Sequence, residues 1–372
     1  MPSVSHRKPF DYVLLGLTAI VVLFGLLMLA SASGPLGYDR FADSYYLVKH
    51  QFIFGLIPGL IGFLIMLRVP YMVWRRFAPH FLILTFLLLI AVFIPGIAAN
   101  IGTAHSWISI GGLFSLQPSE FVKLTLLFYL AAWMASKTPE KIRSFQEGFL
   151  PFVGVLSAVA LLMILQPDIG TLSIIGAIAV VVYFAGGAAL HWLSLIFVTG
   201  LVTLGLLIGL APYRLARFTT FLNPELDPLG IGYHVNQALL AIGSGGFLGQ
   251  GYGHSRQKFQ YLPEVASDSI FAVISEELGF MFATALIVLF VLLTWRILKV
   301  AKEAPDNFGK LVAVGIAAWI AIQAFVNIGA MVAILPITGV PLPFISYGGT
   351  SLAMSLTIMG LVLNISRYRT VR

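Results

Sequence analysis

Long apolar segments follow one another through most of this chain, and this pattern decides which folds are open to it. Hydrophobic residues make up 59% of the 372 residues and charged residues only 10%, whereas soluble domains carry about a quarter charged residues. About 20 apolar residues are the length that a helix needs to cross a bilayer. We therefore expect an all-α polytopic membrane protein with about ten transmembrane helices.

The predicted spans are joined mostly by short connections. They are residues 12–32, 50–68, 79–97, 118–135, 149–165, 170–187, 191–211, 269–297, 311–333 and 349–366. Only residues 166–169 divide the fifth span from the sixth, so one long broken helix is the alternative there. We expect a single domain over residues 1–372, with a large extracytoplasmic loop at about 212–267 between the seventh and eighth spans. Within it, the spacing of Val235, Leu239 and Ile242 predicts a short interfacial helix.

Positive charge is divided unequally between the two sides of these spans. Fifteen lysines and arginines fall on one side and six on the other. Because cytoplasmic loops are rich in Lys and Arg, we expect the first side, and both termini, to be cytoplasmic. We interpret the net charge of +7 as basic loop residues that set the orientation in the membrane and attract anionic lipid headgroups. Nucleic-acid binding is not expected. The chain has no cysteine, which excludes disulfides and thiol catalysis.

Polar residues beside or within the spans are the candidates for function, because ionisable groups are costly in a bilayer. Most lie at the outward ends: Gln117, Ser119, Glu120, Lys123, Gln166, Asp168, Arg214, Arg217, Glu264, Asp268, Glu276, Glu277, Gln323 and Asn327. Structural roles are open for several of them, as helix caps or as a Glu120–Lys123 pair. Glu276 and Glu277 are adjacent and must point apart, so we expect at least one to meet a cation or a polar cavity. The histidines of the outer loops show no spacing typical of a zinc site.

An outward site at the lipid–water boundary, without nucleotide motifs, suits a substrate that carries its own activation. A lipid-linked pyrophosphate sugar is of this kind. Its transition state needs positive charge beside the pyrophosphate and a carboxylate that takes the proton of the attacking hydroxyl. Arg214, Arg217, Arg256 and Lys258 are candidates for the charge, with a divalent cation such as Mg²⁺ or Mn²⁺ as an open addition, and Asp268 is the candidate base. Burial would raise its pKa and a helix N-terminus would lower it, and the sequence leaves the balance open.

Short strings across nearly the whole chain match one family in order. They are residues 117–120 (QPSE), 166–171 (QPDIGT), 223–224, 227–228, 232–233, 237, 242–246 (IGSGG), 261–264 (YLPE), 275–279 (SEELG), 327–329 and 341–349 (PLPFISYGG). The chain thus resembles the SEDS proteins (shape, elongation, division and sporulation), a family of peptidoglycan glycan-strand polymerases. The string at residues 255–259 is more similar to the FtsW division branch than to the RodA elongation branch.

The resemblance implies an inverting peptidoglycan glycosyltransferase of the bacterial cytoplasmic membrane, acting on lipid II. It places the catalytic aspartate at Asp268. Its implied partners are a class B penicillin-binding protein that cross-links the strands and other membrane proteins of division or elongation. Substrate-binding candidates are then Arg214, Arg217 and Lys258 at the pyrophosphate, with Glu120, Lys123, Asp168, Gln237, Ser244 and Trp107 around the cavity.

Two departures from the family pattern affect this site. The family commonly has His-Thr-Asp-Phe where this chain has Ala266-Ser267-Asp268-Ser269, and Ser106 stands where many members have a basic residue before Trp107. Two other functions stay open. A lipid flippase or transporter could use Glu120, Lys123 and Glu276 as a relay, and a non-enzymatic scaffold could hold a division synthase.

Overall fold

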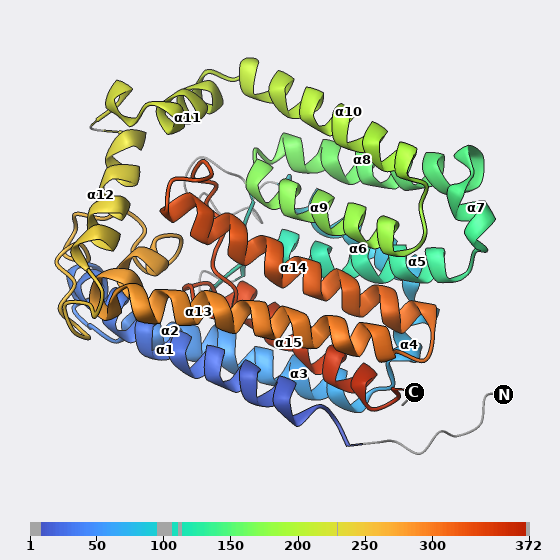
Figure 1. Ribbon diagram of the computed structural model, residues 1–372, viewed down its shortest axis with the longest axis horizontal. Coiled ribbons are helices and arrows are strands. Elements are labelled where there is room, and N and C mark those ends of the chain that lie inside the picture. Colours follow the sequence, from blue (N-terminus) through green and yellow to red (C-terminus); the bar gives the residue numbers. More distant parts are fainter. Residues whose placement is uncertain (1–8, 95–105, 111–113, 229, 370–372) are drawn as a thin grey trace.

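The computed structural model describes residues 9–94, 106–110, 114–228 and 230–369. They form a helical bundle with one small hairpin (Figure 1). The first half contains α1 (Tyr12–Phe41), α2 (Tyr46–Gln51), α3 (Ile57–Arg68), α4 (Tyr71–Arg76), α5 (Ala78–Ala91), the paired strands β1 (Ile108–Ile110) and β2 (Phe114–Leu116), α6 (Pro118–Ala135), α7 (Pro139–Arg143) and α8 (Leu150–Leu165). The second half contains α9 (Ile169–Ala185), α10 (Leu190–Gly209), α11 (Pro212–Leu222), α12 (Ile231–Ser244), α13 (Ile270–Glu303), α14 (Asn307–Met331) and α15 (Gly349–Ser366).

The helices confirm the predicted all-α membrane fold. Among the described residues, seven helices are long and apolar enough to cross a membrane, and α5 and α9 are shorter apolar helices. Every predicted span overlaps a helix, with α6 at the fourth. The fifth and sixth spans are separate helices, α8 and α9, which pack against each other. The exact number of crossings stays a prediction.

A group of polar side chains ties three helix ends together at one end of the bundle. The buried Asp11 carboxylate caps α1 and accepts a hydrogen bond from Arg296 Nε of α13 at 2.8 Å. The backbone N–H of Asp11 donates to Ser366 Oγ at the end of α15. The start of α1 and the ends of α13 and α15 therefore share one side, and α12 lies at the opposite end (Figure 1).

The long connection between α10 and α13 is structured. The predicted helix at 233–242 is confirmed as α12, which buries Ala238 and Ala241 and packs against α13. A second helix, α11, was not predicted. Its Leu215, Phe218 and Leu222 have helical spacing. Arg214 and Arg217 interrupt the apolar pattern, which is why the sequence predicts a loop there.

α13 is broken at Gly279, where φ is +77° and a Cβ would lie 2.3 Å from the backbone N of Gly249. Only glycine fits this conformation and this close approach without strain. Backbone N–H groups of Gln250 and Gly251 donate to the carbonyls of Glu276 and Glu277, each at 2.9 Å. The loop after α12 therefore pairs with the break and fixes the short helical segment that follows Asp268.

Candidate functional site

Asp268 lies two residues before α13 and is held from α14. The Nδ2 amide of the buried Asn327 donates to the Asp268 carbonyl at 2.8 Å and to the Val340 carbonyl at 2.9 Å. The carboxylate lies against Gly339, where a Cβ would be 3.5 Å from Oδ2. One amide side chain therefore fixes both the segment that carries the carboxylate and the segment that faces it.

The surroundings of Asp268 raise its pKa from 3.8 to about 7. The largest cause is burial, which raises the pKa because it disfavours the charged form. The negative charge of Glu264 raises the pKa further. The positive charge of Arg217 opposes both. A pKa near neutral pH is the range that suits a general base.

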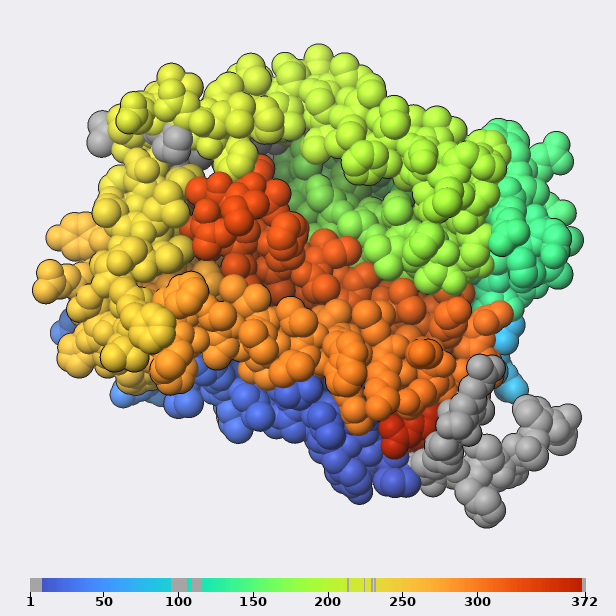
Figure 2. Space-filling model, in the orientation of Figure 1, coloured from blue at the N-terminus to red at the C-terminus, as the bar shows by residue number. Residues whose placement is uncertain are grey.

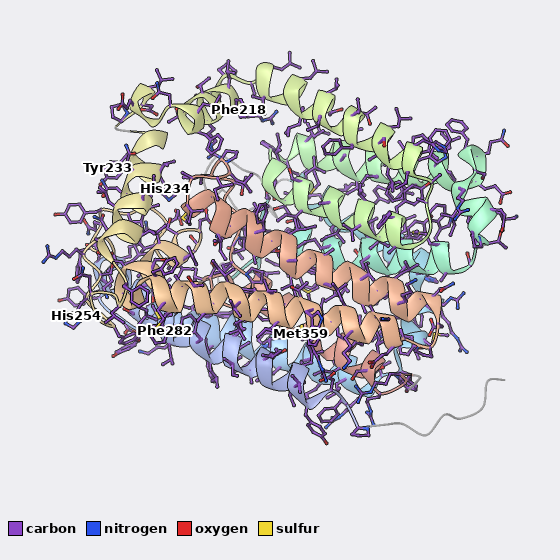
Figure 3. The ribbon with its side chains drawn as sticks, in the orientation of Figure 1. Phe218, Tyr233, His234, His254, Phe282 and Met359 are labelled. Atoms are coloured by element: carbon purple, nitrogen blue, oxygen red, sulfur yellow. The ribbon has the colours of Figure 1, made fainter. Side chains whose placement is uncertain are left out.

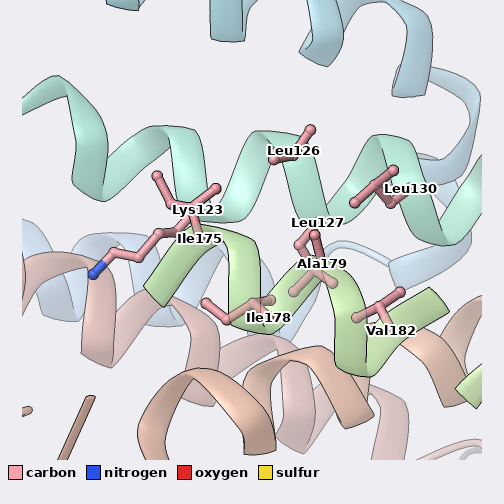
Figure 4. A pocket seen from close by; sticks show the side chains of 8 residues that line it. All are labelled: Lys123, Leu126, Leu127, Leu130, Ile175, Ile178, Ala179 and Val182. Carbon is pink, nitrogen blue, oxygen red and sulfur yellow. The ribbon is translucent and has the colours of Figure 1, made fainter. Parts of the chain in front are cut away.

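A second polar group joins α6 to α14. Lys123 Nζ donates to Glu120 Oε1 at 2.7 Å and to Gln323 Oε1 at 2.8 Å, and all three side chains are buried. The apolar stem of Lys123 lines a small pocket between α6 and α9, while its ammonium points away from the leucines and isoleucines there (Figure 4). The predicted Glu120–Lys123 pair is confirmed, and Gln323 is its third member.

Gln323 and Asn327, one turn apart on α14, connect this group to Asp268. Gln323 Nε2 donates to the Pro341 carbonyl at 2.9 Å, one residue beyond the Val340 carbonyl that Asn327 contacts. Asp168 caps α9 through Thr171 N and interacts electrostatically with Lys123. Several predicted site residues are therefore neighbours in the fold although they are far apart in sequence.

Buried polar atoms in this region have no hydrogen-bond partner among the described residues. They are Ser119 Oγ, Glu120 Oε2, Asp168 Oδ2 and Asn327 Oδ1. Because buried polar groups are almost always satisfied, these atoms indicate a polar cavity that takes up water or a polar ligand.

Lys258 belongs to a different cluster, which corrects its predicted role at a pyrophosphate. Its ammonium donates to Glu277 Oε1 at 2.8 Å, Ser31 Oγ at 3.0 Å and the Gly253 carbonyl at 2.7 Å. A lysine has three N–H donors, so none is left for a substrate. The expectation that one of two adjacent glutamates meets a cation is confirmed at Glu277.

The expectation that Glu276 and Glu277 point apart was wrong, because both bind the turn that carries Lys258. The backbone N–H of Ser255 donates to Glu277 Oε1 at 3.4 Å. The Glu276 carboxylate accepts hydrogen bonds from Ser255 Oγ at 2.5 Å and from the backbone N–H of Arg256 at 2.9 Å. The hydrogen bonds of Glu276 thus belong to a different cluster from those of Glu120 and Lys123, which does not favour the relay of these three residues that a transporter could use.

The other predicted binding residues have varied contacts. Arg217 is exposed and acts on Asp268 electrostatically, whereas Arg214 donates to the Leu207 carbonyl at 3.1 Å. Gln237 and Trp107 are half-buried. Ser244 is exposed at the end of α12, where its hydroxyl donates to the Ala241 carbonyl, so its contacts are those of a helix terminus.

A hollow opens between α10 and α14 (Figure 2). α10 has no buried residue in its span, so it is only loosely attached to the bundle.

No group of three His, Asp or Glu side chains in the described part of the chain is arranged to hold a metal ion. A bound divalent cation therefore stays a prediction.

The fold and these clusters define a multi-pass membrane protein with a buried polar site near one end of its bundle. The chain belongs to the FtsW, RodA and SpoVE family of cell cycle proteins, whose model matches residues 11–371, and this confirms the resemblance seen in the sequence.

Two relatives and one solved structure are similar over almost the full length. Stage V sporulation protein E of Bacillus subtilis is 42% identical, covering 96% of this chain and 97% of the relative. The probable peptidoglycan glycosyltransferase FtsW of Trichlorobacter lovleyi is 41% identical, covering 97% and 95%. A solved structure of a peptidoglycan synthase complex that coordinates polymerization and crosslinking is 28% identical, with a TM-score of 0.76 and coverage of 97% and 98%.

Proposed function

We propose that this protein is a peptidoglycan glycosyltransferase that polymerises lipid II at the outer face of the bacterial cytoplasmic membrane, with both termini in the cytoplasm. Relatives named as probable peptidoglycan glycosyltransferases support the activity. The observation that carries the mechanism is the Asp268 carboxyl, with a pKa raised to about 7 beside Arg217.

Asp268 acts as the general base in this proposal. It takes the proton from the acceptor sugar hydroxyl while that oxygen attacks the anomeric carbon of the donor. The new carbon–oxygen bond forms as the bond to the pyrophosphate oxygen breaks, and undecaprenyl pyrophosphate leaves with the electron pair, so that the configuration inverts. A base with a pKa near ambient pH then returns its proton to water readily.

The other residues of the proposed site bind the two parts of the substrate, the pyrophosphate and the sugars. Arg217, with Arg214 on the same long loop, faces the pyrophosphate. Glu120, Lys123, Asp168 and Gln237 bind the sugars, because the unpartnered oxygens of Glu120 and Asp168 need donors such as sugar hydroxyls. The hollow beside α10 admits the polyprenyl chain from the lipid (Figure 2).

A transpeptidase of the class B penicillin-binding type is the proposed partner. The similar synthase complex, in which polymerization and crosslinking are coordinated, supports such an association. Growth on an Asp268→Ala variant that still binds the partner would favour a scaffold instead.

The pH dependence of polymerisation tests this assignment. We expect kcat/KM to rise with pH through about 7, as Asp268 loses its proton. Glu264→Gln removes a charge that raises this pKa and should move the rise to lower pH, whereas Arg217→Gln should move it to higher pH. Because both side chains are exposed, shifts of about half a unit are expected.

The measurement is lipid II polymerisation by the purified full chain across pH 5–9, with Glu225→Gln, an exposed carboxylate of the same loop, as the control. Shifts in the same direction for both variants, or none for either, would contradict the proposed base.

A further inference from the structure

His234 and Ser269 form a contact next to Asp268 that the proposed reaction does not use. His234 Nε2 lies 2.7 Å from Ser269 Oγ, and Ser269 is fully buried at the start of α13. The same hydroxyl oxygen lies 2.8 Å from the Pro263 carbonyl. Three chain segments therefore meet at one hydroxyl, directly beside the candidate base.

The geometry fixes which atom of this contact is the donor. A carbonyl oxygen can only accept, so the single hydroxyl proton of Ser269 goes to Pro263. The Ser269 oxygen must then accept from His234, whose proton is carried on Nε2. His234 is thus oriented as a donor toward the segment that holds Asp268.

Its position couples α12 to the base. His234 lies on the bundle side of α12, the side that also buries Val235, Ala238 and Ala241, whereas His254 lies at the outer edge of the molecule (Figure 3). Glu264 and Arg217 act electrostatically on both His234 and Asp268. The imidazole therefore shares the surroundings of the carboxylate without itself being its hydrogen-bond partner.

We propose that His234 is a positioning residue for Asp268, and that its Nε2–H···Ser269 hydrogen bond holds the catalytic segment against α12. This inference rests on the proposed function. It also gives a physical role to Ser269, which stands where the family commonly has phenylalanine. Here a polar bridge from α12 orders the residue after the aspartate.

The test uses the purified full chain in lipid II polymerisation assays. His234→Ala is expected to lower kcat by about 10- to 100-fold with little change in KM, because the carboxylate is misplaced rather than the substrate lost. His234→Gln should recover most of kcat, since a Gln side chain can place an N–H donor near the position of Nε2. His254→Ala, in the same loop, should behave as wild type.

Further readouts separate positioning from a merely structural role. Ser269→Ala should match His234→Ala, and the double variant should be no slower than either, because both remove one bridge. In His234→Gln the rise of kcat/KM near pH 7 should persist, since it belongs to Asp268. Unfolding midpoints show whether each variant is folded.

Wild-type kcat in His234→Ala, no recovery in His234→Gln, or additive losses in the double variant would overturn the inference. Retained activity in Asp268→Asn would instead overturn the proposed function, so the two failures are distinguishable.

Discussion

Replacing Asp268 with Asn is expected to lower the rate of glycan polymerisation by about 10²- to 10⁴-fold, the contribution typical of a general base. Asn keeps the size of the side chain and leaves the backbone carbonyl to Asn327, so folding and lipid II binding should survive. The measurement is polymer formation by the full chain, with Asp39→Asn, an exposed carboxylate at the end of α1, as the matched control.

The same variant should be more stable than wild type above pH 7. The folded pKa of Asp268, about 7, lies above its ordinary 3.8, so ionising this half-buried carboxyl costs stability. The cost is absent below pH 3.8, grows between the two values and is complete above pH 7. The unfolding midpoints of wild type and Asp268→Asn should coincide at pH 4 and separate at pH 8. A folded Asp268→Asn variant with wild-type activity would contradict the proposed role of Asp268 as the base.

Lys258→Ala is expected to cause the largest loss of stability. The substitution leaves the fully buried Glu277 carboxylate without its cation, and breaking a buried ion pair costs about 3–5 kcal/mol. The unfolding midpoint should fall by about 5–10 °C, and proteolysis should occur sooner within the loop at 250–260. The physical reason is that this pair, with Ser31 and the turn at Ser255, holds the loop on the broken helix α13.

A double variant, Lys258→Met with Glu277→Gln, should recover most of the lost stability, because no unpaired charge remains and Gln still accepts from Ser31. Lys49→Ala breaks an exposed pair with Asp43 and should leave the midpoint nearly unchanged. An unchanged midpoint in Lys258→Ala would show that the pair does not hold the loop, and a larger loss in the double variant than in the single one would exclude the charge argument.

The sequence could predict the features that depend on local pattern. Apolar length predicted the helices, and the i, i+4 spacing of Gln323 and Asn327 placed them on one face of α14, where both contact residues 340–341. The cost of burying charge predicted that one of Glu276 and Glu277 meets a cation, and Glu277 pairs with Lys258. Each of these inferences needs only helix geometry and the cost of burying charge.

Long-range contacts could not be predicted in this way. The charge of Lys258 fits a pyrophosphate, but nothing local in the sequence indicates its partner Ser31, which lies 227 positions away. The break at Gly279 depends on pairing with the loop after α12, which the composition of α13 does not reveal. Nothing local in the sequence connects His234 to Ser269.

The central claim is tested most directly by the single-turnover rate of lipid II coupling in Asp268→Asn. The rate is measured from pH 5 to pH 9, with donor and acceptor at concentrations above their dissociation constants. We predict that the wild-type rate rises with pH through about 7, and that the variant binds substrate normally but reacts at least about 100-fold more slowly, with no such rise. A variant that couples sugars at the wild-type rate, or keeps the same rise near pH 7, would show that another group accepts the proton.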